Sequence, residues 1–145
     1  MEIVLAAALL PAIILMVYVY KHDKIEKEPF VLLLTLFAFG ALSCVPAGIL
    51  EDLFSEVLDS MNIQDNQTYY IIMCFGIVAC SEEGAKLFFL KSKTWRCPDF
   101  NYTFDGLLYS VCVGLGFAGL ENIMYVMDYG FGVVISRGLL SVPGH

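Results

Sequence analysis

The chain has 145 residues, 59% of them hydrophobic and 16% charged, with a mean hydropathy of +0.74. A soluble domain is typically about 45–50% apolar and about 25% charged, so this composition excludes an ordinary water-soluble domain. The net charge is -7 and only eight residues are Lys or Arg, which argues against nucleic-acid binding. The five cysteines form no CxxC pair, so we expect structural thiols rather than disulfides or a metal site.

Long continuous apolar runs predict an all-α fold, a multi-pass bundle of transmembrane helices. A bilayer core about 30 Å thick requires about 20 apolar residues per helix. A transmembrane β-barrel would instead need shorter segments of alternating hydrophobicity. We expect a single transmembrane domain over residues 1–145, with helices at about 3–20, 30–50, 69–90, 104–127 and 131–145.

The first and last runs need separate interpretation. The run 3–20 could be a cleaved signal peptide, but its flank Met1-Glu2 is acidic and no small-residue cleavage site precedes Lys21, so we expect a retained helix. The last run stops at His145 after about 14 residues, which would span about 21 Å as a helix. The sequence therefore predicts four full helices and a truncated fifth.

Lys and Arg residues in the short loops predict the orientation in the membrane. They occur in the loops 21–29 and 91–103, whereas the connection 51–67 has five acidic residues and none that is basic. The positive-inside rule then places both basic loops in the cytoplasm. The amino terminus and the acidic connection would lie outside.

Three charged residues interrupt the third run: Glu82, Glu83 and Lys86. A charge at mid-membrane costs at least about 2.5–3.5 kcal/mol, so such residues are usually functional. The i, i+4 spacing of Glu82 and Lys86 also fits a purely structural ion pair, which is the alternative interpretation. That pair leaves Glu83 unexplained, because adjacent residues point about 100° apart on a helix. Two adjacent carboxylates beside one Lys are a setting in which a Glu can exchange a proton near neutral pH.

Further polar residues interrupt the later runs: Asp105, Glu121 with Asn122, Arg137 and His145. Each has a structural alternative. Asp105 could cap a helix start, and Glu121 with Asn122 could form hydrogen bonds between helices. Arg137 could anchor its helix at the interface, and His145 could be a hydrogen-bonded structural residue.

The glycines of the fourth run fit the dinucleotide fingerprint GxGxxG between Gly114 and Gly119. No predicted strand precedes them and no βαβ unit surrounds them, so we reject nucleotide binding. Gly114 and Ala118 have i, i+4 spacing, which predicts a close-packing helix face instead.

Helix arithmetic gives two of the acids different depths. Counted from the cytoplasmic side at 1.5 Å per residue, Glu82 lies about 12 Å deep and Glu121 about 26 Å deep. A helix start near Tyr109 would bring Glu121 to about 18 Å. The acids could then meet, together with His145, which enters from the outside.

Together these side chains could activate water for hydrolysis. One of the paired glutamates could be the general base, with Lys86 adjusting the charge and Glu121 orienting or sharing the proton. Asn122 and His145 offer hydrogen-bond donors for an oxyanion. Neither an HExxH zinc motif nor a serine-protease motif is present. A divalent metal on Glu121, His145 and one of the paired glutamates is chemically possible, but adjacent glutamates rarely both bind a metal, so we expect no cofactor.

At these positions the sequence resembles a known family. Glu82-Glu83-Gly84-Ala85-Lys86 resembles the EExxK motif of the PrsW family of intramembrane proteases. Phe104-Asp105-Gly106 and Gly116-Phe117-Ala118-Gly119-Leu120-Glu121-Asn122 resemble its FDG and GFAxxEN segments, and the segment from Arg137 to His145 resembles its Arg-to-His helix. The match covers roughly residues 69–145, with the motifs in the right order.

The resemblance implies a glutamate-dependent protease of the bacterial plasma membrane, distantly related to CAAX prenyl endopeptidases and bacteriocin-immunity membrane proteins. It implies Glu82 and Glu83 as the catalytic pair and His145 as a third essential group. Our candidate catalytic residues are therefore Glu82, Glu83, Glu121 and His145, and the candidate supporting residues are Lys86, Asp105, Asn122 and Arg137. The family is associated with site-1 cleavage of a membrane-spanning anti-sigma factor, which releases a stress response.

Two other functions fit the same polar residues. A non-catalytic immunity or signalling module could keep them for helix packing. A proton or cation pathway could also use buried acids and histidines. The partners expected for the protease are the lipid bilayer and a single-pass membrane protein substrate.

Overall fold

The computed structural model describes residues 2–22, 27–130, 132–137 and 141–144. Every secondary-structure element in these ranges is helical, which confirms the predicted all-α fold. The elements are, in chain order, α1 (Glu2–His22), α2 (Phe30–Ser60), α3 (Asn66–Ile71), the π-helical η1 (Ile72–Val78), α4 (Ala79–Thr94), α5 (Thr103–Tyr129), α6 (Val133–Ser136) and α7 (Val142–Gly144).

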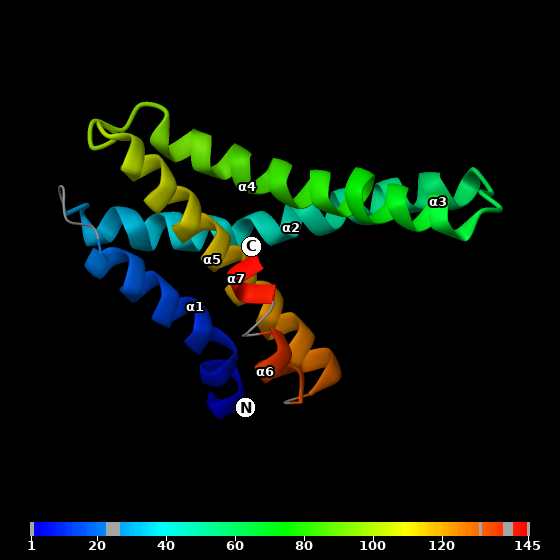
Figure 1. Ribbon diagram of the computed structural model, residues 1–145, viewed down its shortest axis with the longest axis horizontal. Coiled ribbons are helices and arrows are strands. Elements are labelled where there is room, and N and C mark those ends of the chain that lie inside the picture. Colours follow the sequence, from blue (N-terminus) through cyan, green and yellow to red (C-terminus); the bar gives the residue numbers. More distant parts are fainter. Residues whose placement is uncertain (1, 23–26, 131, 138–140, 145) are drawn as a thin grey trace.

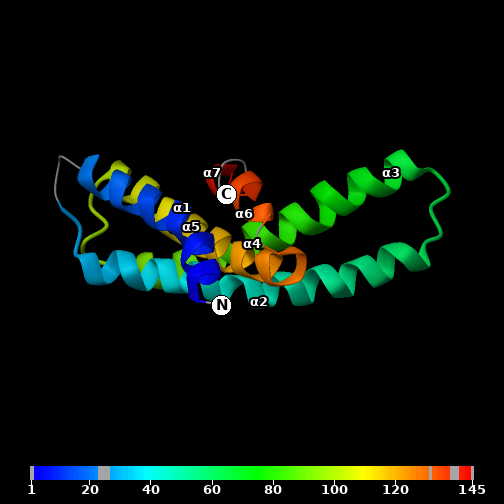
Figure 2. The ribbon, with the colours of Figure 1, turned by 90° about the horizontal axis from the view of Figure 1, so that it is seen from below.

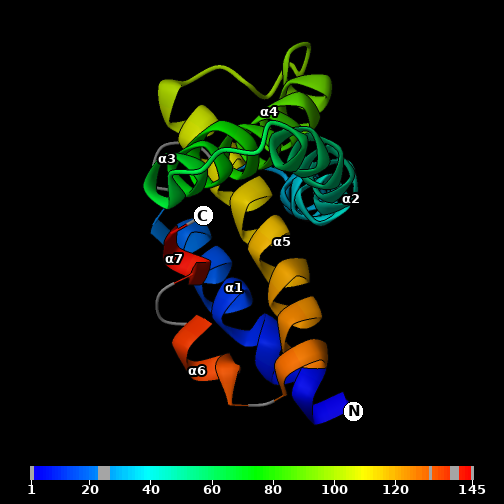
Figure 3. The same cartoon turned by 90° about the vertical axis from the view of Figure 1, so that its right-hand side faces the viewer.

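The helices lie in two layers. The segment from α3 to α4 runs back alongside α2 (Figure 1), and these helices form the upper layer in Figure 3. Below them α1 and α5 pack against each other, with α6 and α7 beside them. α5 is inclined to α2 and crosses it. Figure 2 shows α2 and α3 separating toward the segment that joins them.

α2 extends past residue 50, where the sequence predicted its end, to Ser60. The acidic stretch that begins at Glu51 is therefore helical and not part of a loop. It contains neither Gly nor Pro, and Leu58 on one of its faces is buried at 3% exposure. The turn comes only at Asn62, which has a positive φ of 49°. Asn is one of the few residues other than Gly that adopts this conformation readily.

The third helical region is also longer than the predicted 69–90. It begins at Asn66, one residue after Asp65, whose carboxylate accepts hydrogen bonds from the amides of Gln67 and Thr68. This is an N-cap, which satisfies amides that have no partner within the helix. The backbone stays helical through α3, η1 and α4 to Thr94, so these elements form one continuous rod.

α2 and α5 cross in direct backbone contact. A Cβ atom added at Gly40 would lie 1.9 Å from the carbonyl oxygen of Val113, and one added at Gly116 would lie 1.9 Å from that of Phe37. Only glycine fits at such a crossing. Residues 112–119 are all buried, as the predicted close-packing face requires.

Two of the described helices, α2 and α5, are long and apolar enough to cross a bilayer, and the Ala8–His22 part of α1 is a shorter apolar helix. Large apolar side chains of α2 point outward, and Val31, Val45 and Ile49 are each more than half exposed. An exposed apolar surface of this kind suits lipid better than water. The predicted helix 131–145 is described only at α6 and α7, and His145 lies outside the described residues.

Candidate active site

Lys86 joins the two glutamates of α4 in an ion-pair triad. Its Nζ lies 2.7 Å from Glu83 Oε1 and 3.3 Å from Glu82 Oε2. Residues three and four positions before a helical Lys lie on its side of the helix, so one ammonium group reaches both carboxylates. The predicted pair of Glu82 and Lys86 is present, but the closer partner of Lys86 is Glu83. We call these three residues the α4 triad.

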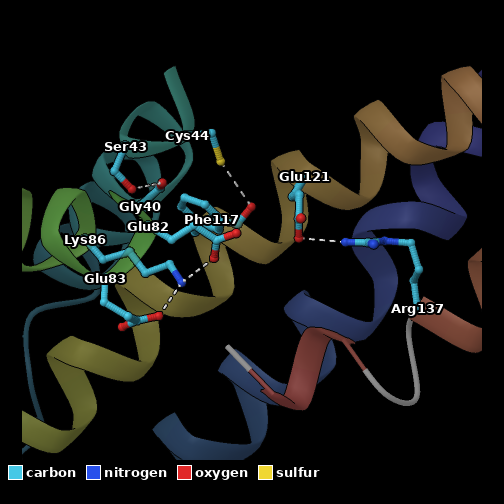
Figure 4. Close-up of polar contacts among 9 residues, drawn as sticks. All are labelled: Gly40, Ser43, Cys44, Glu82, Glu83, Lys86, Phe117, Glu121 and Arg137. Atoms are coloured by element: carbon cyan, nitrogen blue, oxygen red, sulfur yellow. Dashed lines mark hydrogen bonds and ion pairs between the residues drawn. The ribbon is translucent and has the colours of Figure 1, made fainter. Parts of the chain in front are cut away.

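The members of the α4 triad differ in exposure. The side chain of Lys86 is 6% exposed, that of Glu82 15% and that of Glu83 67%. Lys86 also lies over the ring of Phe117 on α5, with Nζ 4.1 Å from the ring centroid. A buried ammonium group needs such partners, because it has lost its water. Figure 4 shows the triad facing α5.

A second ion pair lies one helical turn beyond Phe117. Glu121 Oε2 accepts a hydrogen bond from Arg137 Nη2 at 2.6 Å, which links α5 to the segment after α6 (Figure 4). The Arg137 guanidinium also stacks on Tyr125, with Cζ 3.7 Å from the ring centroid. Both charged side chains are about 15% exposed. Arg137 is thus paired with Glu121 and is more than the interface anchor of the structural alternative.

α2 packs against the same part of α4 and α5. Cys44 donates a hydrogen bond from Sγ to the carbonyl oxygen of Phe117 at 3.4 Å. Cys44 and Ala47 form one buried cluster with Ala85 of α4 and Phe117 of α5, and Glu51, one turn beyond Ala47 on α2, is half-buried. The α4 triad and Glu121 therefore lie near the place where α2, α4 and α5 meet (Figure 4).

The two acids do not meet in the way that helix arithmetic suggested. α5 begins at Thr103, close to the predicted start at about residue 104, and not near Tyr109, the later start that equal depths would have required. The predicted depths treated the helices as parallel to one another. α5 is instead inclined to α2 and α4 (Figure 1), so equal distances along the two helices do not mean equal depths.

The remaining candidate residues lie elsewhere. Asp105 Oδ2 accepts hydrogen bonds from the amides of Asn101 and Tyr102 at 2.9 and 2.6 Å, so it caps the start of α5. Asn122 is completely buried, and its amide donates to the carbonyl oxygen of Ala8 on α1 at 2.6 Å. Asp105 is thus a helix cap and Asn122 forms a hydrogen bond between helices, as the structural alternatives for these two residues predicted. The position of His145 lies outside the described residues.

Sequence reasoning missed Glu51 and Cys44. Cys44 lies in an apolar run and has the composition of an ordinary core residue. Glu51 was assigned to the acidic connection. The available signal was spacing, because Cys44, Ala47 and Glu51 recur at helical intervals on one face of α2.

The described donor set does not form a metal site. No group of three His, Cys, Asp or Glu side chains among the described residues is arranged to hold a metal ion. The two carboxylates of the α4 triad share the ammonium group of Lys86, and Glu121 is paired with Arg137. A divalent cation here would meet two fixed positive charges, which oppose its binding.

A cavity of about 400 Å³ opens beside the α4 triad. Glu83 and Lys86 line one part of it. The rest of the wall is mostly apolar and comes from α1, α4, α5 and α7, including Leu15, Leu87 and Val113. The more exposed carboxylate of the triad thus borders an apolar space large enough for several side chains.

Comparison with known proteins agrees with the motifs. The family described as PrsW family intramembrane metalloprotease matches residues 28–145. Protease PrsW of Shouchella clausii is 33% identical over 139 residues, which cover 96% of this chain and 61% of that protein. Protease PrsW of Bacillus subtilis is 30% identical over 142 residues, covering 98% and 62%.

Protease PrsW of Geobacillus kaustophilus is also 30% identical, over 97% of this chain and 60% of its own length. The chain thus spans about three fifths of the length of these curated relatives. No solved structure matches it. The family match extends over most of the chain and includes the α4 triad, Glu121 and Arg137, and on this evidence the chain belongs to the PrsW family.

Proposed function

We propose that the protein is an intramembrane endopeptidase that uses glutamate to activate water for peptide-bond hydrolysis. The observation that carries this proposal is the α4 triad, whose Lys86 lies against Phe117 of α5, one helical turn before Glu121. Membership of the PrsW family supports it, as do the names of the curated relatives, which are proteases.

Glu82 is the best-placed general base. Its side chain is 15% exposed and lies 3.3 Å from the fixed positive charge of Lys86. Glu82 takes a proton from water while the water oxygen attacks the carbonyl carbon of the substrate. The proton then passes to the leaving amide nitrogen as the C–N bond breaks.

The positive charges of Lys86 and Arg137 hold the glutamates in place during this reaction. Lys86 limits the repulsion between Glu82 and Glu83. It is also the donor that we propose for the negative oxygen of the tetrahedral intermediate. Arg137 keeps Glu121 in place through a 2.6 Å hydrogen bond. Glu121 then orients the water or shares its proton.

The description of the family includes a metal ion. Glu82, Glu83 and Glu121 are already paired with Lys86 and Arg137, so these three carboxylates do not fit a metal, and the steps above use carboxylates alone.

The substrate that we propose is a single-pass membrane protein, with site-1 cleavage of an anti-sigma factor as the most specific form of the proposal. The apolar cavity beside Glu83 suits a segment taken from a membrane-spanning helix. We propose the orientation given by the positive-inside rule, in the bacterial plasma membrane. The amino terminus lies outside, and the loops 21–29 and 91–103 lie in the cytoplasm.

The test is cleavage of a tagged single-pass anti-sigma factor by the full-length protein in bacterial membranes. Glu82→Gln should lower the cleavage rate at least about 100-fold, because it removes the base. Glu83→Gln should lower it about 10-fold or more, because Lys86 loses its closer partner and moves. Asp128→Asn removes the same charge from an exposed position on α5 and should leave cleavage unchanged.

Membrane levels of each variant are measured in parallel. Full cleavage by both Gln variants would overturn the glutamate mechanism. If both variants disappear from the membrane, the triad serves packing, as the non-catalytic alternative requires.

A further inference from the structure

Acidic and basic residues gather at opposite ends of α2 and α4. The start of α2 and the end of α4 lie at one end of the molecule in Figure 1, and the turn between α2 and α3 lies at the other. The turn is flanked by Asp59 and Asp65, whereas the end of α4 carries Lys91, Lys93 and Arg96, which we call the basic cluster. The end of α4 is thus locally basic in a chain whose net charge is -7.

The basic cluster is exposed, and the described part of the protein does not neutralise it. None of the three ion pairs among the described residues involves the cluster, because their cations are Lys86 and Arg137. Asp99 follows the cluster in the chain, and its carboxylate accepts a hydrogen bond from the Cys97 thiol at 3.5 Å. Exposed cations without a carboxylate partner attract anions from outside the protein.

A hollow of about 430 Å³ lies between the end of α4 and the start of α2. Lys93 and Arg96 line it, and because they are three residues apart at a helix end, they lie on the same side. Val31 and Leu32 of α2 line it as well, and Asp99 is the acid at its wall. The hollow therefore combines a net positive charge with apolar side chains.

A second hollow, of about 420 Å³, shares Arg96 with the first. Its other lining residues include Phe88, Lys91 and Trp95. The Nζ atom of Lys91 lies 5.6 Å from the ring centroid of Trp95, and the Trp95 side chain is 74% exposed. An exposed Trp beside a cation is typical of the headgroup level of a bilayer, where one ring meets both water and apolar chains.

Exposed apolar side chains continue from both hollows along the two helices. Val31 and Leu34 of α2 and Phe88 of α4 are each more than half exposed. A free phosphate ion would contact the cations and leave this apolar surface uncovered. A phospholipid with a negative headgroup would cover both, because its phosphate meets the cations and its acyl chains meet the apolar side chains.

We propose that the basic cluster binds the headgroup of an anionic phospholipid, whose acyl chains lie on the exposed apolar side chains of α2 and α4. Arg96 lines both hollows and, with Lys93, donates charge-assisted hydrogen bonds to the lipid phosphate. Lys91 adds positive charge from the second hollow. The inference concerns lipid binding and does not depend on the proposed protease function.

The experiment uses Trp95 as the reporter, since it is the only Trp in the sequence. The purified full-length protein is placed in phosphatidylcholine vesicles that contain increasing fractions of phosphatidylglycerol brominated on its acyl chains. A second series contains brominated phosphatidylcholine instead. Bromine quenches the fluorescence of a Trp that it contacts, so quenching measures which lipid lies beside Trp95. The Trp95→Phe protein gives the background that is subtracted.

The anionic lipid should be preferred. Half-maximal quenching should need a fraction of brominated phosphatidylglycerol at least about ten-fold lower than that of brominated phosphatidylcholine. Lys93→Gln and Arg96→Gln should each raise the required phosphatidylglycerol fraction about five-fold, because each removes one cation from the headgroup. Lys93→Arg keeps the charge and should keep the preference.

Lys21→Gln is the matched control, because Lys21 is exposed at the end of α1 and lines neither hollow. It should leave the preference within about two-fold, since an exposed charge outside the site is screened by salt. Equal quenching by the two lipids in the wild type would overturn the inference. So would an equal loss in Lys21→Gln and Lys93→Gln, which would mean that only the total charge attracts the lipid.

A further series separates the lipid from a free anion. Inorganic phosphate, compared with chloride at the same ionic strength, should not reduce quenching by brominated phosphatidylglycerol. A reduction by phosphate alone would show that the site takes a free phosphate ion and would refute the lipid assignment. If Arg96→Gln does not accumulate in the membrane, Lys93→Gln and Lys93→Arg decide.

Discussion

The ammonium group of Lys86 lies 4.1 Å from the centre of the Phe117 ring, so α4 and α5 meet through a cation and an aromatic face. Lys86 is 5% exposed and Phe117 3%. The contact is therefore away from solvent, where a cation–π interaction contributes about 2 kcal/mol. It fixes the α4 triad against the helix that carries Glu121.

A double-mutant cycle tests this contact. Lys86→Met and Phe117→Leu, alone and together, should show a coupling energy of about 1–2 kcal/mol in the free energy of unfolding in detergent. Lys91 and Trp95 form a matched exposed pair, with Nζ 5.6 Å from the ring centroid, and should couple more weakly. Equal coupling in the two pairs would contradict the buried contact.

The glycine crossing gives a prediction about stability. Gly116→Ala places a Cβ 1.9 Å from a backbone oxygen of α2, so the helices must separate, and we expect a loss of about 2 kcal/mol or more in the free energy of unfolding. Gly48→Ala on α2 meets no atom within 4 Å and serves as the control. Thermal denaturation in detergent measures both. A Gly116→Ala protein as stable as Gly48→Ala would show that the helices do not cross as described.

Chelation tests the carboxylate mechanism. Lys86 Nζ lies within 3.3 Å of both glutamates of the α4 triad, so their carboxylates already have a cationic partner. We expect cleavage by the purified full-length protein to stay within about two-fold after treatment with a strong chelator. A zinc protease is treated in parallel as the positive control. Activity that is lost on chelation and restored by added Zn²⁺ would show that a metal acts in the reaction.

The hydrogen bond between Tyr109 and Glu28 gives a prediction for the segment before α2. The Tyr109 hydroxyl donates to Glu28 Oε2 at 2.5 Å, and both residues are buried, at 0% and 4% exposure. Tyr109→Phe removes this donor from a buried carboxylate and should destabilise the protein by about 1–3 kcal/mol. Tyr70→Phe, at a 64% exposed position, should have little effect in the same unfolding assay. Equal effects of the two substitutions would contradict a role for the hydrogen bond.

The N-cap of α3 gives a prediction about pH. Hydrogen bonds from the Thr68 hydroxyl, and then from the amides of Thr68 and Gln67, hold the pKa of Asp65 below its ordinary value of 3.8. Because the pKa is lower in the folded protein, the stabilisation is complete above 3.8 and is lost as the pH falls through the folded value. A carbon-13 NMR titration of Asp65 in detergent should have its midpoint below 3.8, and Thr68→Val should raise it. An unmoved midpoint in Thr68→Val would contradict this cause.

The sequence by itself determined the class of the protein and its main candidate site residues. Continuous apolar runs require helices in a bilayer, because helices satisfy every backbone hydrogen bond within the segment. Charges inside such a run are expensive, so Glu82, Glu83 and Lys86 were conspicuous. The spacing of Glu82 and Lys86 also predicted their ion pair, since helical neighbours are fixed by local geometry.

The sequence placed the end of α2 too early because an acidic stretch resembles a loop. Polarity is a weak guide at the end of a transmembrane helix, where a helix can continue into water. The three turns after residue 50 contain no helix breaker, and they carry Glu51 on the buried face. Because residue 51 was assigned to a loop, the sequence did not indicate that Glu51 lies on a buried helix face.

Tertiary structure alone decided which of these residues meet. Lys86 of α4 lies against Phe117 of α5, one turn before Glu121, and the position of α5 depends on its backbone contacts with α2 at Gly40 and Gly116. A pattern along one helix shows which residues share a face. It does not contain the angle at which two helices cross, because that angle is set by the fit of both surfaces.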